Sequence, residues 1–229
     1  GITNATAAGW GNLGGGVTQF LIPAMYEAIA KTKVDFTAWR YAFFLPGCMH
    51  IFVGLAVLFF AQDLPDGQYS KLKKSGQMIK PKGSVAFYQA IMNYRMWVLL
   101  ASYGMCFGVE LTMNNIIVTY LFDQFNLGLT TAGLLGSLFG MMNLFARSVG
   151  GFMSDEAAKR YGMRGRLWVL WIVQTLEGGM CIFMGLSKDS LAWTLFACVC
   201  FSSFVQAAEG ASYGVVPFVS KRSLGVVSG

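Results

Sequence analysis

The chain has 229 residues, of which 55% are hydrophobic and only 12% are charged, and its formal net charge is +6. A soluble domain of this size carries roughly 25% charged residues to cover its surface, so the composition excludes an ordinary soluble protein. The apolar residues come in blocks of about 20, which is long enough to cross a bilayer as helices, and they lack the alternation of a membrane β-barrel. We therefore predict an all-α integral membrane protein.

Six membrane spans are predicted in chain order. They cover Ala8–Ile29, Ala38–Ala61, Met96–Phe122, Thr131–Gly151, Leu167–Leu186 and Leu191–Val216. A seventh span begins at Gly225, and Thr130 or Thr131 can cap the fourth. Because the chain starts without methionine and stops within an apolar run, we expect an internal fragment of a longer protein.

The basic residues predict the orientation of the chain. Of the 17 Lys and Arg residues, twelve lie in the loops after spans two, four and six, four lie in the other loops, and Arg147 lies within span four. Since cytoplasmic loops are enriched in Lys and Arg, the even-numbered loops are predicted to be cytoplasmic. This division also favours a membrane over nucleic acid as the partner of the basic residues.

The position of the one long polar segment predicts the domain organisation. In a carrier built of two six-helix halves, such a segment joins the halves. Residues 1–61 would then be the last two helices of the N-terminal half, 62–95 the central cytoplasmic loop, and 96–229 the first four helices of the C-terminal half with the start of a fifth.

Metal, cofactor and enzyme chemistry find little support in the sequence. There is one histidine, His50, and the five cysteines form no CxxC pair. We expect the cysteines to serve as small hydrophobic residues within the spans. We predict no metal, no cofactor and no enzyme activity.

A block of glycines in the first span, AGWGNLGGGVTQ, matches GxGxxG but lacks the preceding buried strand that a dinucleotide site needs. Close helix packing is the better explanation, because glycine lets two backbones approach in lipid. Asn12, Gly16 and Gln19 share one helical face. The predicted packing residues of this span are Gly11, Gly14, Gly15 and Gly16.

The fourth span carries a single polar stripe that centres on Arg147. Its members are Gly136, Gly140, Asn143, Arg147 and Gly150, at steps of 4, 3, 4 and 3 residues. An arginine within a span is costly and is by default a functional candidate. Snorkelling to the membrane surface and a purely structural ion pair are the alternatives.

The third span carries Tyr103, Phe107, Glu110 and Asn114 on one face. Glu177 and Glu209 are the other carboxylates within spans. Each of the three glutamates is a candidate for carrying a proton, and a hydrogen-bonded structural role is the alternative for each.

The loop after span four begins with Gly151-x-x-x-Asp155 and ends with basic residues, as in the loop signature of the major facilitator superfamily. Three segments resemble the nitrate/nitrite porters of that superfamily, and in particular the high-affinity nitrate transporters of plants, algae and fungi. They are AGWGNLGGGVTQF, FARSVGGFMSD and AEGASYGVVPFVSKRSLGVVSG. The resemblance implies a helical bundle of which this chain covers about helices five to ten and the start of eleven.

The resemblance also implies the site. Nitrate would be held near the midplane between two arginines, of which the second-half arginine falls on Arg147 and the other is not in this sequence. Tyr103 and Phe107 match the aromatic positions of helix seven, and Asn12 matches an asparagine of the glycine signature. Gly151 and Asp155 would serve the conformational change.

The implied function is secondary active import of nitrate, or nitrite, by alternating access in the plasma membrane, with a co-transported proton. We predict Glu110 as the proton carrier, because it lies near mid-depth and shares a face with the aromatic residues, with Glu177 and Glu209 as alternatives. The partners are nitrate, the proton and membrane lipid, and the sequence does not decide whether an accessory membrane subunit binds. A carrier of another small anion and a nitrate sensor without flux remain as alternatives.

Overall fold

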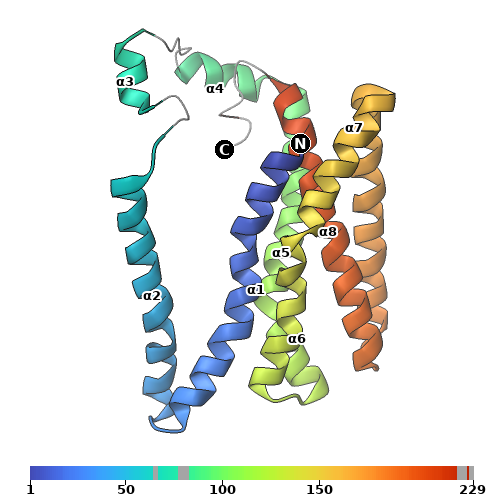
Figure 1. Ribbon diagram of the computed structural model, residues 1–229. Helices are drawn as coiled ribbons and strands as arrows, with labels where there is room; N and C mark the ends of the chain where they lie inside the picture. The colour runs from blue at the N-terminus through green and yellow to red at the C-terminus, as the bar shows by residue number, and fades with distance from the viewer. Residues whose placement is uncertain (64–66, 77–82, 221–225, 227–229) are drawn as a thin grey trace.

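The computed structural model describes residues 1–63, 67–76, 83–220 and 226. These residues form helices and no strands, which confirms the predicted all-α class (Figure 1). The elements are α1 (Ile2–Ala30), α2 (Asp35–Phe60), α3 (Tyr69–Lys74), α4 (Gly83–Ile91), α5 (Tyr94–Phe125), α6 (Leu129–Met141), η1 (Met142–Leu144), α7 (Ala146–Leu186) and α8 (Leu191–Val219).

Within the described residues, four helical stretches are long and apolar enough to cross a membrane, namely Asp35–Phe60, Tyr94–Phe125, Leu129–Leu186 and Leu191–Val219. The third stretch has 58 residues and contains two of the predicted spans. The chain turns back within it at Gly162, whose φ of 59° is a conformation that favours glycine. α1 is long enough to span, but its glycines and amides keep it outside this apolar group. The predicted seventh span at Gly225 lies outside the described residues.

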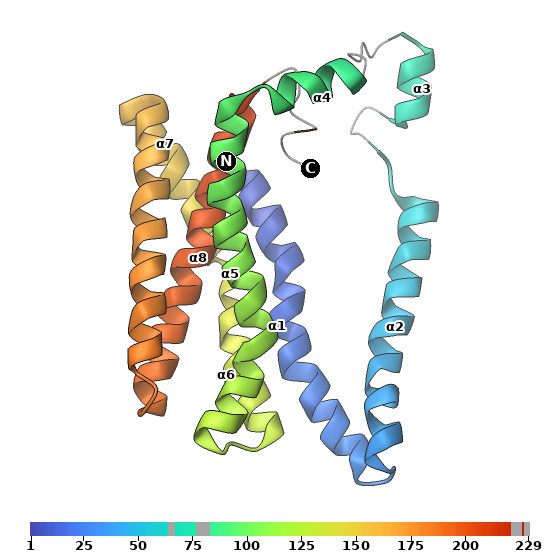
Figure 2. The ribbon, with the colours of Figure 1, turned by 180° about the vertical axis from the view of Figure 1, so that it is seen from behind.

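The connections between the long helices gather at two opposite ends of the bundle (Figures 1 and 2). Residues 31–34, 126–128 and 187–190 lie at the lower end, whereas α3, α4 and the bend of α7 lie at the upper end. This alternation matches the predicted order of the spans. The segment predicted as a polar loop at 62–95 differs in that it contains the short helices α3 and α4.

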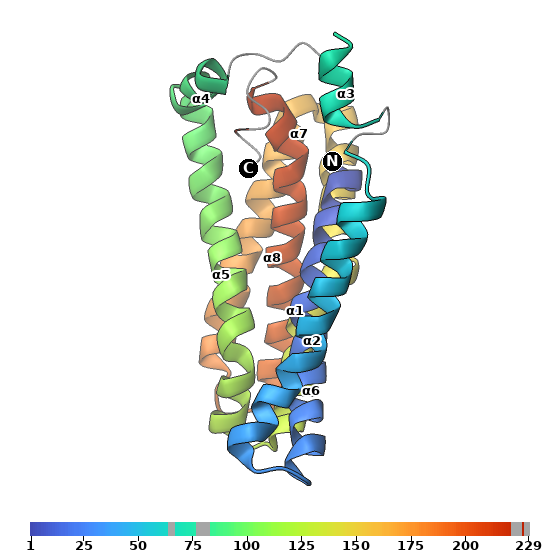
Figure 3. The same ribbon diagram turned by 90° about the vertical axis from the view of Figure 1, so that its left-hand side faces the viewer.

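α2 stands apart from α5 to α8 and is joined to the bundle through α1 (Figure 1). Its buried residues, Ala38 and Ala42, lie near its start, where it packs against α1. Farther along, large apolar side chains such as Phe52 and Phe60 are exposed, as expected for a helix that contacts lipid. Seen from the side, the axes of α1, α2, α5 and α8 are roughly aligned with one another (Figure 3).

Glycines set the closest helix contacts. The backbones of α1 and α6 meet at Gly16 and Gly140, where a Cβ on Gly16 would lie 2.7 Å from the carbonyl carbon of Gly140. The contact between α7 and α8 is equally tight, because Gly210 lies directly against the carbonyl oxygen of Arg147 and Gly150 against that of Ala207. Small residues thus let backbones touch where side chains would separate them.

The packing prediction for the first glycine block is correct for one face of α1 only. Gly16 makes the contact described above, and a Cβ on Gly15 would lie 3.9 Å from Asn114. Gly11 and Gly14 were also predicted to pack, but among the described residues no atom lies within 4 Å of a Cβ on either. The packing of Gly11 and Gly14 therefore stays a prediction, because the described residues include no neighbour on their face of α1.

The ends of α5 and α6 have recognisable caps. Asn93 Oδ1 accepts a hydrogen bond from the backbone N–H of Arg95 at 3.1 Å, and Asn126 closes α5 in the left-handed conformation with φ of 49°. α6 begins at Leu129 with Gly128 as N-cap, so the predicted threonine cap is wrong. The backbone N–H of Thr130 instead donates to Glu27 Oε1 at 3.0 Å.

We expect Gly210→Ala to destabilise the protein, because the added methyl group would overlap the carbonyl oxygen of Arg147. Overpacking of this kind costs about 1–3 kcal/mol. The matched control is Gly178→Ala in α7, where no described atom lies within 4 Å of the added Cβ. Thermal unfolding of the two full-length variants in detergent measures the effect, and equal midpoints would show that α7 and α8 can separate at no cost.

Candidate functional site

A break in a membrane helix positions the central arginine. α6 ends at Met141, the 3₁₀ turn η1 follows, and Phe145 has a non-helical φ of −135° before α7 begins at Ala146. Arg147 therefore starts a new helix, and Asn143 lies within the break itself. α1 lies close against this point, since a Cβ on Gly9 would be 2.8 Å from the carbonyl oxygen of Asn143.

The break is bound by polar groups of α8. The carbonyl oxygen of Phe139, at the end of α6, accepts hydrogen bonds from Gln206 Nε2 at 3.0 Å and from the hydroxyl of Ser202. Both side chains are fully buried. A backbone group next to a helix break needs such partners in a membrane, so α8 stabilises the interruption that places Arg147. Ser202 and Gln206 were not among the predicted site residues, although both are polar residues within a predicted span.

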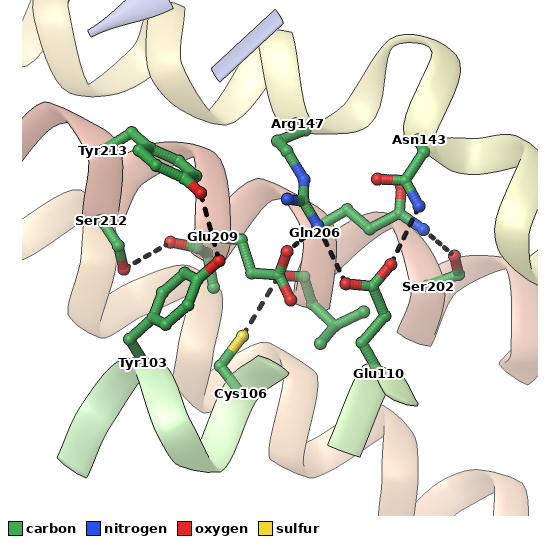
Figure 4. Close-up of polar contacts among 12 residues, drawn as sticks. Tyr103, Cys106, Glu110, Asn143, Arg147, Ser202, Gln206, Glu209, Ser212 and Tyr213 are labelled. Atoms are coloured by element: carbon green, nitrogen blue, oxygen red, sulfur yellow. Dashed lines mark hydrogen bonds and ion pairs between the residues drawn. The ribbon is translucent and has the colours of Figure 1, made fainter. Parts of the chain in front are cut away.

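Arg147 is held between two carboxylates from two other helices (Figure 4). Its Nη2 lies 2.8 Å from Glu110 Oε2 of α5 and also forms an ion pair with Glu209 Oε2 of α8. Asn143 Nδ2 donates to Glu110 Oε1 at 2.9 Å. All four side chains are at most 1% exposed, so the cluster is shielded from solvent in this structure. With every group ionised, one guanidinium and two carboxylates carry a formal net charge of −1.

This geometry excludes snorkelling, one of the two alternatives for Arg147. Snorkelling would place the guanidinium at the membrane surface, whereas Arg147 is 1% exposed and paired in the interior. Asn12 of α1 also reaches it, and with its amide oxygen facing the guanidinium it accepts from Nη2 at 2.9 Å and Nη1 at 3.3 Å. The Nε–H of Arg147 has no hydrogen-bond partner among the described residues, which leaves one donor of the guanidinium free.

Aromatic rings lie on the same face of α5 as Glu110. Tyr103 and Phe107 are stacked, with ring centroids 5.5 Å apart and an interplanar angle of 20°. Tyr213 of α8 meets Tyr103 edge-on at 6.0 Å, and the two hydroxyl oxygens are 3.4 Å apart. Tyr213 was not among the predicted site residues, although it follows Glu209 by one helical turn and so shares its face.

Two other predicted residues lie outside the Arg147 cluster. Glu177 is 6% exposed and accepts a hydrogen bond from the thiol of Cys106 at 3.2 Å. Cys106 is therefore more than the small hydrophobic residue that we expected, because its thiol is a buried donor. Asn114 receives the side-chain amide of Gln19 and belongs to the contact between α1 and α5.

Gly151 and Asp155 lie along the first part of α7, beside the start of α1. A Cβ on Gly151 would be 2.7 Å from the Cβ of Ala5. Asp155 Oδ1 accepts from Arg166 at 2.6 Å, and its Oδ2 accepts from the backbone N–H of Ile2 at 2.9 Å. Asp155 thus connects both sides of the α7 bend with the start of α1.

A guanidinium and carboxylates buried at a helix break, inside a bundle of apolar helices, define a multi-pass membrane protein with a polar centre. A family model described as the Major Facilitator Superfamily matches residues 3–229. The chain belongs to the major facilitator superfamily, which confirms the predicted fold class.

Several curated proteins resemble the chain along its whole length. It is 51% identical to the high-affinity nitrate transporter 2.3 of Oryza sativa subsp. japonica over 230 residues, and 51% identical to the high affinity nitrate transporter 2.5 of Arabidopsis thaliana over 230 residues. It is 50% identical to nitrate transporter 2.2 of Chlamydomonas reinhardtii over 233 residues. The chain spans 45–46% of the length of these relatives. No solved structure matches.

We expect Arg147→Met to destabilise the protein by about 3–5 kcal/mol, because it leaves two buried carboxylates without their cation. The triple variant Arg147→Met, Glu110→Gln, Glu209→Gln removes all three charges and recovers most of this loss. Thermal unfolding of the full-length variants in detergent measures both changes. A triple variant no more stable than Arg147→Met would show that the three charges are not energetically coupled.

Proposed function

We propose that the protein is a secondary active transporter that imports nitrate, with Arg147 as its anion ligand in the C-terminal half. The observation that carries the proposal is the buried guanidinium of Arg147, which keeps an unpaired Nε–H donor at a helix break. The identity of about half of all positions with proteins named as nitrate transporters supports nitrate as the anion. The import takes place in the plasma membrane.

The chemistry of the site suits a planar anion. Nitrate is flat and weakly hydrated, and the N–H groups of a guanidinium can hydrogen-bond to it in its own plane. The amide of Asn12 lies at the same guanidinium and can share the anion. Phe107 lies one turn and Tyr103 two turns from Glu110 along α5. The edges and faces of the two rings would limit the size of the anion and exclude water.

The two carboxylates give a physical reason for coupling to protons. With the cluster at a net charge of −1, an added nitrate would raise the buried negative charge to −2. Repulsion at these distances is strong in a medium of low dielectric constant. A proton bound to one of the carboxylates returns the net charge to −1. It also releases an N–H donor of the Arg147 guanidinium. Nitrate and proton would therefore load together, and an inward-negative membrane potential drives import when more than one proton accompanies each nitrate.

Alternating access would use the glycine contacts that the fold provides. The backbones of α1 and α6 meet at Gly16 and Gly140 without intervening side chains, so the two helices can slide with little obstruction. Asp155, held by Arg166 and by the start of α1, would latch one of the two conformations. In this cycle the site opens to each side of the membrane in turn.

We expect Arg147→Lys to reduce nitrate binding by tenfold or more, because lysine keeps the positive charge but loses the planar set of donors. The matched control is Arg160→Lys, an exposed arginine of α7 that should bind nitrate as the wild type does. Nitrate binding to the purified full-length variants, measured by calorimetry, tests the expectation. Wild-type affinity in the lysine variant would return Arg147 to a purely structural ion pair.

Uptake into proteoliposomes distinguishes the proposed function from its alternatives. A nitrate importer accumulates labelled nitrate when a proton gradient is imposed, and unlabelled nitrate competes better than chloride, formate or sulfate. A carrier of another small anion would show a different order of competition. A nitrate sensor would bind nitrate saturably but would give no accumulation under any gradient.

A further inference from the structure

The two carboxylates that contact Arg147 are not equivalent (Figure 4). Both oxygens of Glu110 face a donor, since Oε1 accepts from Asn143 at 2.9 Å and Oε2 from Arg147 at 2.8 Å. Only Oε2 of Glu209 is paired, through the ion pair with Arg147. Glu209 Oε1 is fully buried and has no hydrogen-bond partner among the described residues.

This difference determines where a proton can be added. A proton added to either oxygen of Glu110 would weaken a contact that this oxygen already makes, either the hydrogen bond from Asn143 or the ion pair with Arg147. Glu209 Oε1 has a free lone pair and no donor facing it. An unpaired buried carboxylate oxygen is costly, whereas a protonated carboxyl group is a smaller burden in the same surroundings.

The position of Glu209 is fixed by its neighbour in the chain. Gly210 lies directly against the carbonyl oxygen of Arg147, so the backbone of α8 cannot carry the Glu209 side chain away from the guanidinium without separating α7 from α8. Neutralisation by a proton is therefore the local way to release Arg147 from Glu209.

We propose that Glu209 is the residue that takes up a transported proton, and that Glu110 stays ionised as a positioning residue for Arg147. The proposal rests on the proposed nitrate transport. Uptake of one proton by Glu209 and one nitrate by Arg147 keeps the formal charge of the buried site at −1 before and after loading. Glu110, with a donor at each oxygen, keeps the guanidinium in place in both states.

Other titratable groups lie in or around the Arg147 cluster. Among the described residues, none of them combines burial, an ion pair with Arg147 and an unpaired carboxylate oxygen, as Glu209 does. They are Tyr103, Cys106 and Glu110 of α5, Arg147 and Glu177 of α7, and Tyr213 of α8. α1 contributes the neutral amide of Asn12, η1 contributes that of Asn143, and α6 has no charged side chain. Of the two remaining carboxylates, Glu110 has both oxygens paired, whereas Glu177 accepts from Cys106 and forms no ion pair with Arg147 in the described part of the chain.

The test is nitrate affinity across a series of mildly acidic to mildly basic pH values, measured by calorimetry on the purified full-length protein. If binding requires one proton, the wild-type Kd rises about tenfold per pH unit above the range in which Glu209 is protonated. Glu209→Gln should lose this slope and keep an affinity near the acidic wild-type value. Glu110→Gln should bind more weakly but keep the slope. Glu156→Gln, an exposed carboxylate of α7, should match the wild type.

A second measurement covers the case in which Glu209→Gln does not fold. Titrations in two buffers of different ionisation enthalpy give the number of protons taken up with each nitrate, and Glu110→Gln should retain the wild-type number. Loss of proton uptake in Glu110→Gln, or a wild-type slope in Glu209→Gln, would overturn the assignment to Glu209. Absence of nitrate binding by the wild type at every pH would instead reject the proposed function, and the assignment with it.

Discussion

The ion pair of Arg147 with two buried carboxylates is the constraint on which the rest of the structure depends. A single guanidinium in a membrane interior needs compensation, and here it comes from two helices that lie far apart in the sequence, α5 and α8. The helix break at η1, the glycine contacts and the polar groups of α8 all serve to bring these helices to the same point. The centre contains one carboxylate more than it has guanidinium groups, so with every group ionised it carries a formal net charge of −1.

Much of the fold follows from local patterns in the sequence. Blocks of apolar residues predicted where the long helices lie, and steps of three and four residues predicted that Tyr103, Phe107 and Glu110 share one face. These predictions need only helical geometry and the thickness of a bilayer. The same reasoning correctly set Asn12 on a face that meets another helix, where it reaches Arg147.

What the sequence could not predict depends on which helices are neighbours. Glu209 was an alternative proton carrier, but its contact with Arg147 is a meeting of α8 with α7 that no local pattern reveals. Tyr213 and Gln206 acquire their roles in the same way. The helix break was also unforeseen, because residues 141–145 contain no proline or glycine and the hydrogen bonds from α8 to Phe139 depend on which helices are neighbours. Gly11 and Gly14 show the converse, since glycine content alone does not say which face of a helix is covered.

The hydrogen bonds from α8 to the end of α6 have a mechanical consequence. Because Gln206 and Ser202 bind the carbonyl oxygen of Phe139, and Gly210 lies against Arg147, α8 and the broken helix are bound together and would move as one body. Glu209 travels with that body, whereas Glu110 belongs to α5. A tilt of α5 against this body would lengthen the contact of Arg147 with Glu110 while leaving the contact with Glu209 unchanged. The two ion pairs of one arginine would therefore respond to different events, one to the movement of a helix and the other, under the proposal for Glu209, to the arrival of a proton.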